Sequence, residues 1–234
     1  MGKVLFEVSG LPGSGKSTYV NRILKDNSYF EKEENYYIDT YGSLLKRINS
    51  LKYCFRGFGG CQDFVFLLKL ICDKDVNKKV IAVKKIFKIW RFWGKFELIP
   101  KDYLLSEGFI QSYLELMDCM ICADKKYIIS FFIERIKLYP KLFFVIIITD
   151  YNTAYHRIDG RVGVNNSVDQ MQNMERRRFL IKRERNTDHL LYAIKKYIDP
   201  NRYILIDARD SINNNVEIIQ NFITDIIYNE HRKK

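Results

Sequence analysis

The feature that most limits what this chain can fold into is a glycine-rich segment near its N-terminus. Residues 10–18 read Gly-Leu-Pro-Gly-Ser-Gly-Lys-Ser-Thr and match G-x-x-x-x-G-K-[ST] at every fixed position. The apolar run Lys3 to Val8 precedes this segment, and a helical pattern from Lys16 to Lys25 follows it. In that order, backbone N–H groups and a helix N-terminus can surround an anion. The sequence therefore predicts a phosphate-binding loop between a strand and a helix.

The motif also assigns chemistry to its side chains. Lys16 is expected to reach the β- and γ-phosphates of a nucleoside triphosphate, and the Ser17 hydroxyl to ligate Mg²⁺. The predicted nucleotide-binding residues of the loop are Gly10, Pro12, Gly13, Ser14, Gly15, Lys16, Ser17 and Thr18.

The rest of the chain alternates strand and helix patterns, which favours an α/β fold with a central parallel sheet and helices on both faces. With 234 residues, 47% of them hydrophobic, we expect a single domain covering residues 1–234. The interval 41–101 is mostly helical by pattern and is interpreted as an acceptor-binding insertion. The interval 157–185 is rich in arginine and is interpreted as a lid. The strand candidates after the first are Tyr36–Ile38, Tyr103–Ser106, Leu142–Thr149 and Tyr203–Ile206, which makes five strands.

The formal net charge of +11 favours anionic partners without choosing among them. No run of the sequence is long and apolar enough to cross a bilayer, so we expect a cytoplasmic protein. The segment Lys84–Phe96 combines basic residues with both tryptophans. It fits a core helix, a contact with a membrane or lipid-linked substrate, or a platform on which an acceptor stacks.

Four patches resemble the thymidylate kinase and deoxynucleoside kinase group of P-loop kinases. They are the phosphate-binding loop, Tyr103–Ser112, Asn152–Arg161 and Tyr203–Ile212, in the order that the group has them. The resemblance implies a three-layer P-loop fold with a mostly parallel sheet, ATP as the phosphoryl donor, and an adenine-contacting loop that includes Ala208. It also implies lid arginines at Arg157 and Arg161, and it makes a dimer plausible.

One departure concerns the acceptor. The group usually has arginine after the acidic residue of the second patch, and this chain has Glu107-Gly108. The acceptor is therefore expected to be another small molecule or a glycan end with a hydroxyl or phosphate group. Phosphoryl transfer needs charge neutralisation and one carboxylate near the acceptor hydroxyl. The predicted catalytic residues are Lys16, Asp39, Glu107, Arg157 and Arg161, with Asp39 and Glu107 left open as the base and Glu107 joining Ser17 at the metal.

The leading functional hypothesis is an ATP- and Mg²⁺-dependent kinase that acts on a small-molecule or glycan acceptor. One alternative is a nucleotide-gated regulatory ATPase that engages nucleic acid or a protein partner, although nucleic acid is not favoured. Another is an orthodox nucleoside monophosphate kinase. ADP release that depends on an acceptor distinguishes the kinases from the regulatory ATPase.

Overall fold

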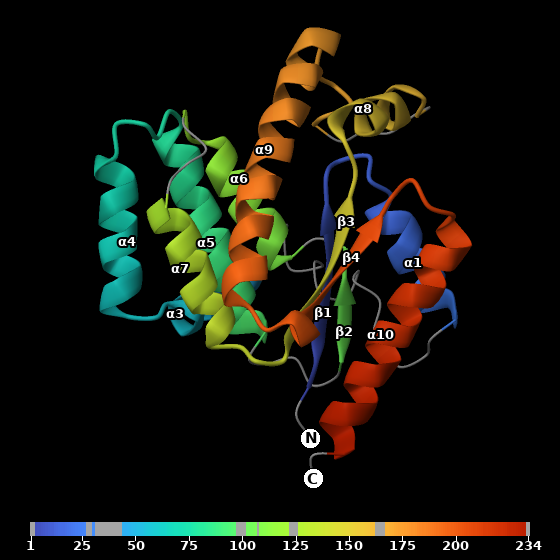
Figure 1. Cartoon of the computed structure of the whole chain (residues 1–234). Coiled ribbons are helices and arrows are strands. Elements are labelled where there is room, and N and C mark those ends of the chain that lie inside the picture. The colour runs from blue at the N-terminus through green and yellow to red at the C-terminus, as the bar shows by residue number, and fades with distance from the viewer. Residues whose placement is uncertain are drawn as a thin grey trace.

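The computed structural model in Figure 1 describes residues 3–26, 30, 44–96, 102–106, 108–121, 126–161 and 167–232. Its sheet has four described strands: β1 (Leu5–Gly10), β2 (Tyr103–Leu105), β3 (Leu142–Ile148) and β4 (Tyr203–Asp207). Their order is β2-β1-β3-β4, and every neighbouring pair is parallel. Because parallel strands end at the same edge, the loops after all four strands meet there, which is where ligands bind in open α/β sheets.

Helices cover both faces of this sheet, giving three layers (Figure 1). On one face lie α1 (Lys16–Asp26) and α10 (Ile212–Arg232). The opposite side carries α3 (Leu44–Gly57), α4 (Cys61–Cys72), α5 (Lys79–Phe96), α6 (Phe109–Asp118), α7 (Lys126–Lys137) and α9 (Asn173–Tyr197). The shorter α8 (Tyr151–Asp159) follows β3, and a 3₁₀ turn (Pro200–Arg202) leads into β4.

β1, β2 and β3 are buried on both faces, as is usual for the inner part of a parallel sheet, whereas Leu205 of the outer strand β4 is exposed. Alternate residues of β1 pack into different hydrophobic cores. Leu5 belongs to the core between the sheet and helices α5, α6, α7 and α9, whereas Phe6 and Val8 belong to the core between the sheet and helices α1 and α10. Glu7 is on the same face as Leu5 by this alternation and is 0% exposed. A fully buried acidic residue in the strand before the phosphate-binding loop needs a partner, and α6 provides it, as described below.

The segment Lys84–Phe96 belongs to α5, and the structure supports its interpretation as a core helix. Both Trp90 and Trp93 are buried, at 4% and 0% exposure, and Trp93 packs against Phe109 and Tyr139. Neither tryptophan is therefore available to a membrane or to a stacked acceptor, so the structure does not support those two interpretations for Trp90 and Trp93. None of the helices in the described part of the chain is both long and apolar enough to span a membrane.

The α/β class with a parallel sheet is confirmed, and the region 44–96 is helical as expected. The fifth predicted strand, Tyr36–Ile38, lies outside the described residues. The expected lid, residues 157–185, has a different organisation in its second half. From Asn173 onward it forms the start of α9, where Arg176 is buried and bonds the carbonyl oxygens of Val168, Asp169 and Met171.

Candidate active site

The phosphate-binding loop between β1 and α1 has a backbone that suits glycine. Gly13 and Gly15 have φ of +84° and +94°, a left-handed region that residues with a Cβ rarely adopt. A Cβ on Gly13 would also lie 2.6 Å from the carbonyl oxygen of Ala154 in α8. The loop is thus packed closely against the helix that follows β3.

Two observations test whether this loop suits a triphosphate. The Lys16 ammonium group lies across the loop and donates to the carbonyl oxygens of Gly10 at 3.1 Å and Leu11 at 3.0 Å. The buried Ser14 hydroxyl has no hydrogen-bond partner among the described residues. A cation and a polar group held beside the N-terminus of α1 fit an anion.

Of the two predicted metal ligands, Ser17 belongs to the described residues. Ser17 is exposed to the cavity beside Lys16, as the motif requires. No cluster of three His, Cys, Asp or Glu side chains occurs in the described part of the chain. A hydroxyl ligand such as Ser17 suits Mg²⁺, which usually keeps several waters and uses one or two protein groups together with substrate phosphates.

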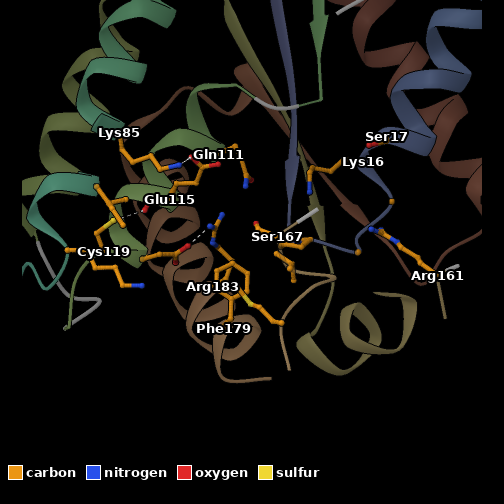
Figure 2. Close-up of a pocket in the computed structure, with 18 of the residues that line it drawn as sticks. Lys16, Ser17, Lys85, Gln111, Glu115, Cys119, Arg161, Ser167, Phe179 and Arg183 are labelled. Carbon is orange, nitrogen blue, oxygen red and sulfur yellow. Dashed lines mark hydrogen bonds and ion pairs between the residues drawn. The ribbon is translucent and has the colours of Figure 1, made fainter. Parts of the chain in front are cut away.

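A cavity of about 770 Å³ extends from the phosphate-binding loop to α5, α6 and α9. Figure 2 shows Lys16, Ser17 and Arg161 on one side of it, and Lys85, Gln111, Glu115 and Arg183 on the other. Its volume is in the range of small-molecule sites. The polar side chains that line it are Lys16, Ser17, Thr18, Lys78, Lys85, Gln111, Glu115, Asp118, Arg161, Ser167 and Arg183.

Glu7 of β1 fixes the N-terminus of α6 at the wall of this cavity. Its carboxylate accepts hydrogen bonds from the backbone N–H of Phe109 at 2.7 Å and of Gln111 at 3.2 Å. Burial raises the pKa of Glu7 to about 7, although the backbone N–H groups of residues 108–111 act to lower it. A carboxylate in this position satisfies orphan N–H groups of the first helical turn.

The same contact explains why residue 108 is glycine. A Cβ on Gly108 would lie 2.8 Å from Cδ and 2.9 Å from Oε2 of Glu7. Cβ atoms essentially never come that close to other atoms, so Gly108 and the buried Glu7 are complementary. The kinase group usually has arginine at the position of Gly108. In this chain the backbone there lies too close to Glu7 for a Cβ, so a larger side chain does not fit.

The far wall of the cavity carries two carboxylates from α6, and each forms ion pairs with basic side chains. Glu115 Oε2 accepts from Lys85 Nζ at 2.6 Å and from Lys88 Nζ at 3.2 Å. Burial acts to raise the pKa of Glu115, but Lys88 and Lys85 outweigh burial and leave that pKa below its usual range. Asp118 is paired with Arg183 of α9 and accepts from Asn186 Nδ2 at 2.9 Å.

The structure brings some predicted residues together and leaves others apart. Lys16, Ser17 and Arg161 line one cavity. Arg157 does not line it; its Nη2 donates to the carbonyl oxygen of Ala208 at 2.8 Å. The predicted lid arginine Arg157 is thus in contact with Ala208, the residue assigned to the adenine-contacting loop. The two carboxylates proposed as the base, Asp39 and Glu107, lie outside the described residues.

Sequence reasoning missed the polar residues that α6 contributes to the far wall. Gln111, Glu115 and Asp118 are spaced four and three residues apart, so one face of the otherwise apolar α6 presents all three. That stripe was a readable signal. Arg183 offered no comparable signal, because it is one of several arginines on α9 and only tertiary packing distinguishes it.

No family model matches the sequence, and no curated protein matches it either. Among solved structures, the chain is similar to deoxyadenosine kinase from M. mycoides. The structure of that enzyme with products dCMP and a flexible dCDP bound has a TM-score of 0.52 and 16% identity, covering 95% of this chain and 99% of that one. Its structure with bound dATP has a TM-score of 0.52 and 14% identity, covering 94% and 99%. At these identities the similarity shows only that the chain shares the fold of that enzyme.

Proposed function

We propose that this chain is a phosphotransferase that moves the γ-phosphoryl group of ATP to the hydroxyl group of a small acceptor. The observation that supports the proposal most is the cavity that joins the phosphate-binding loop to the polar wall of α6 and α9. A regulatory ATPase needs only the nucleotide end. A cavity with a second polar end, built from three further helices, suits a second substrate.

The reaction assigns roles along this cavity. The acceptor hydroxyl oxygen forms a bond to the γ-phosphorus while the bond from that phosphorus to the β–γ bridging oxygen breaks. The products are ADP and a phosphate monoester, and the hydroxyl proton passes to a carboxylate or to water. Asp39 and Glu107 are the proposed carboxylates. Mg²⁺, when bound, would neutralise charge on the β- and γ-oxygens, with Ser17 as a protein ligand.

The remaining charged groups of the site stabilise and position. Lys16 would supply positive charge to the transferred phosphoryl group. Arg161 lines the same end of the cavity and would bind phosphate oxygens there. Arg157 donates a hydrogen bond to the carbonyl oxygen of Ala208. It would therefore help to order the β4–α10 loop, which is predicted to contact the adenine ring. These roles need little covalent chemistry from the protein.

Acceptor-dependent ADP release tests the proposal. Wild-type protein, Lys16→Ala and Arg178→Gln are assayed with Mg-ATP against panels of nucleosides, nucleoside monophosphates, sugars and sugar phosphates. Arg178 is an exposed arginine of α9 outside the cavity lining, so its variant controls for general loss of positive charge.

We expect at least one acceptor to stimulate ADP release saturably. Lys16→Ala should lower that stimulated rate roughly 100-fold or more without changing the melting temperature, because the lysine is an electrostatic group and not a core contact. Retention of more than about a tenth of the rate would contradict the role of Lys16. Nucleotide hydrolysis that no acceptor stimulates would favour the regulatory ATPase.

A further inference from the structure

The wall of the cavity opposite the phosphate-binding loop carries more cations than anions. Lys85 and Lys88 both donate to one oxygen of Glu115, so two ammonium groups share a single carboxylate. Lys78 lies exposed at the same wall. Among the described lining residues of this wall, three are cations (Lys78, Lys85 and Arg183) and two are carboxylates (Glu115 and Asp118). Lys88 adds a further positive charge beside Glu115 without lining the cavity. Like charges held this close repel each other, and a bound anion would relieve that repulsion.

Arg183 is the buried member of this set. It is 3% exposed, and neither Nε nor Nη1 has a hydrogen-bond partner within the described ranges. Figure 2 shows its guanidinium group pointing into the cavity, below Gln111. Gln111 is also buried, and its Oε1 has no described partner. Buried polar groups of native proteins are normally satisfied, so these groups indicate a polar ligand or bound water between them.

The position of Arg183 is held from both sides. Asp118 pairs with Nη2, and the face of Phe179 lies 5.2 Å from the guanidinium carbon. These contacts orient the side chain before a ligand arrives, and guanidinium groups fixed in this way suit phosphate oxygens.

The apolar part of the lining argues against a nucleobase. Phe179 is the single aromatic residue among the described lining residues, and Arg183 already covers it. The other apolar lining residues, Ile81, Val168 and Met171, offer no flat π-face for stacking. A base gains much of its binding energy from such a face. A compact polar acceptor does not depend on stacking against an aromatic face.

We propose that the acceptor is a hydroxylated phosphate monoester of the sugar phosphate class, with its phosphate bound by Arg183 and Lys85 and attracted by Lys78. The inference rests on the proposed kinase function and identifies its second substrate. A phosphate monoester carries between one and two negative charges near neutral pH, which matches the surplus on this wall. Its free hydroxyl would face the phosphate-binding loop.

Calorimetric titration tests the inference without depending on turnover. The protein is first saturated with Mg-ADP, so that the phosphate-binding loop is filled. Ribose 5-phosphate and glycerol 3-phosphate are then titrated, in comparison with ribose, thymidine and thymidine monophosphate. The same titrations are made with Arg183→Gln, Arg183→Lys, Lys78→Gln and the control Arg178→Gln.

The two phosphorylated polyols should bind, and ribose and thymidine should not. Arg183→Gln should weaken binding of the phosphates roughly 10-fold or more, because it removes charge-assisted hydrogen bonds. Arg183→Lys should retain part of the affinity. Lys78→Gln should weaken binding a few-fold, and its effect should shrink at high salt because the charge is exposed. Arg178→Gln should bind as the wild type does.

Arg183→Gln leaves Asp118 without its ion pair, so each variant is first checked for wild-type unfolding behaviour. Lys78→Gln carries the test if Arg183→Gln fails to fold, because Lys78 is exposed. Equal binding of ribose and ribose 5-phosphate would overturn the inference, as would binding of thymidine monophosphate without binding of the sugar phosphates. Failure to bind Mg-ADP in the first step would instead refute the proposed kinase function itself.

Discussion

The buried carboxyl group of Glu7 makes the stability of this protein depend on pH in a calculable way. Its pKa is about 7 in the folded chain against an ordinary value of 4.5, because burial outweighs the backbone N–H groups that it bonds. Between these two values the folded state holds a proton that the unfolded state has lost. Stability from this group is therefore greatest below pH 4.5, and it falls as the pH rises to about 7.

The size of the effect follows from the same two values. The folded pKa of about 7 and the ordinary value of 4.5 imply a decrease in unfolding free energy of about 3 kcal/mol, since one pKa unit corresponds to about 1.4 kcal/mol. Glu7→Gln removes this titration and keeps a carbonyl oxygen for the N-terminus of α6. The wild-type unfolding free energy minus that of Glu7→Gln should therefore decrease by about 3 kcal/mol from pH 4.5 to above pH 7.

Urea unfolding followed by tryptophan fluorescence measures this difference, because Trp90 and Trp93 are both buried. Both proteins are unfolded at several pH values across the window. Subtracting the two curves cancels every other group that titrates in the same range. A difference that stays constant within about 1 kcal/mol from pH 5 to pH 8 would refute the assignment of a raised pKa to Glu7.

Three further predictions concern Gly108, Arg157 and the buried ion pair between Arg135 and Asp63. Gly108→Ala should lower the unfolding free energy by about 1–3 kcal/mol in urea titrations, because its Cβ would crowd Glu7; in the double variant Glu7→Ala/Gly108→Ala this second loss should shrink. Arg135→Ala should cost about 3–5 kcal/mol in the same assay, since it leaves the buried Asp63 without its ion pair. Arg157→Ala should raise the KM for ATP more than it lowers kcat in steady-state kinetics, because Arg157 bonds Ala208 and does not line the cavity; an unchanged KM would remove it from the nucleotide end.

Much of the architecture was readable from the sequence because local patterns decide it. The apolar runs predicted β1, β3 and β4, and the glycine-rich motif lies between a strand and a helix, as its chemistry requires. The core role of α5 was harder to read, because its lysines and aromatics form no single stripe. Trp93 is buried partly by Phe109 and Tyr139, which lie on other elements of the chain.

The far wall of the site was less predictable for the same reason. Arg183 reaches Asp118 across 65 residues, and Glu7 reaches Phe109 across 102 residues. No periodicity in a single segment encodes such pairs. The absence of arginine at position 108 was visible in the sequence, but its cause became clear only when Glu7 was placed beside it.

The place of β1 in the sheet has a consequence for how the chain acquires its phosphate-binding loop. β1 is the first strand in sequence, yet its two neighbours are β2, which begins at Tyr103, and β3, which ends at Ile148. During synthesis the glycine-rich loop leaves the ribosome early, but its strand has no partner on the β3 side until more than half of the chain has been made. Such long-range parallel pairing forms slowly and leaves strand edges exposed meanwhile. We therefore expect the glycine-rich loop, which is translated first, to become ordered late, when β3 pairs with β1.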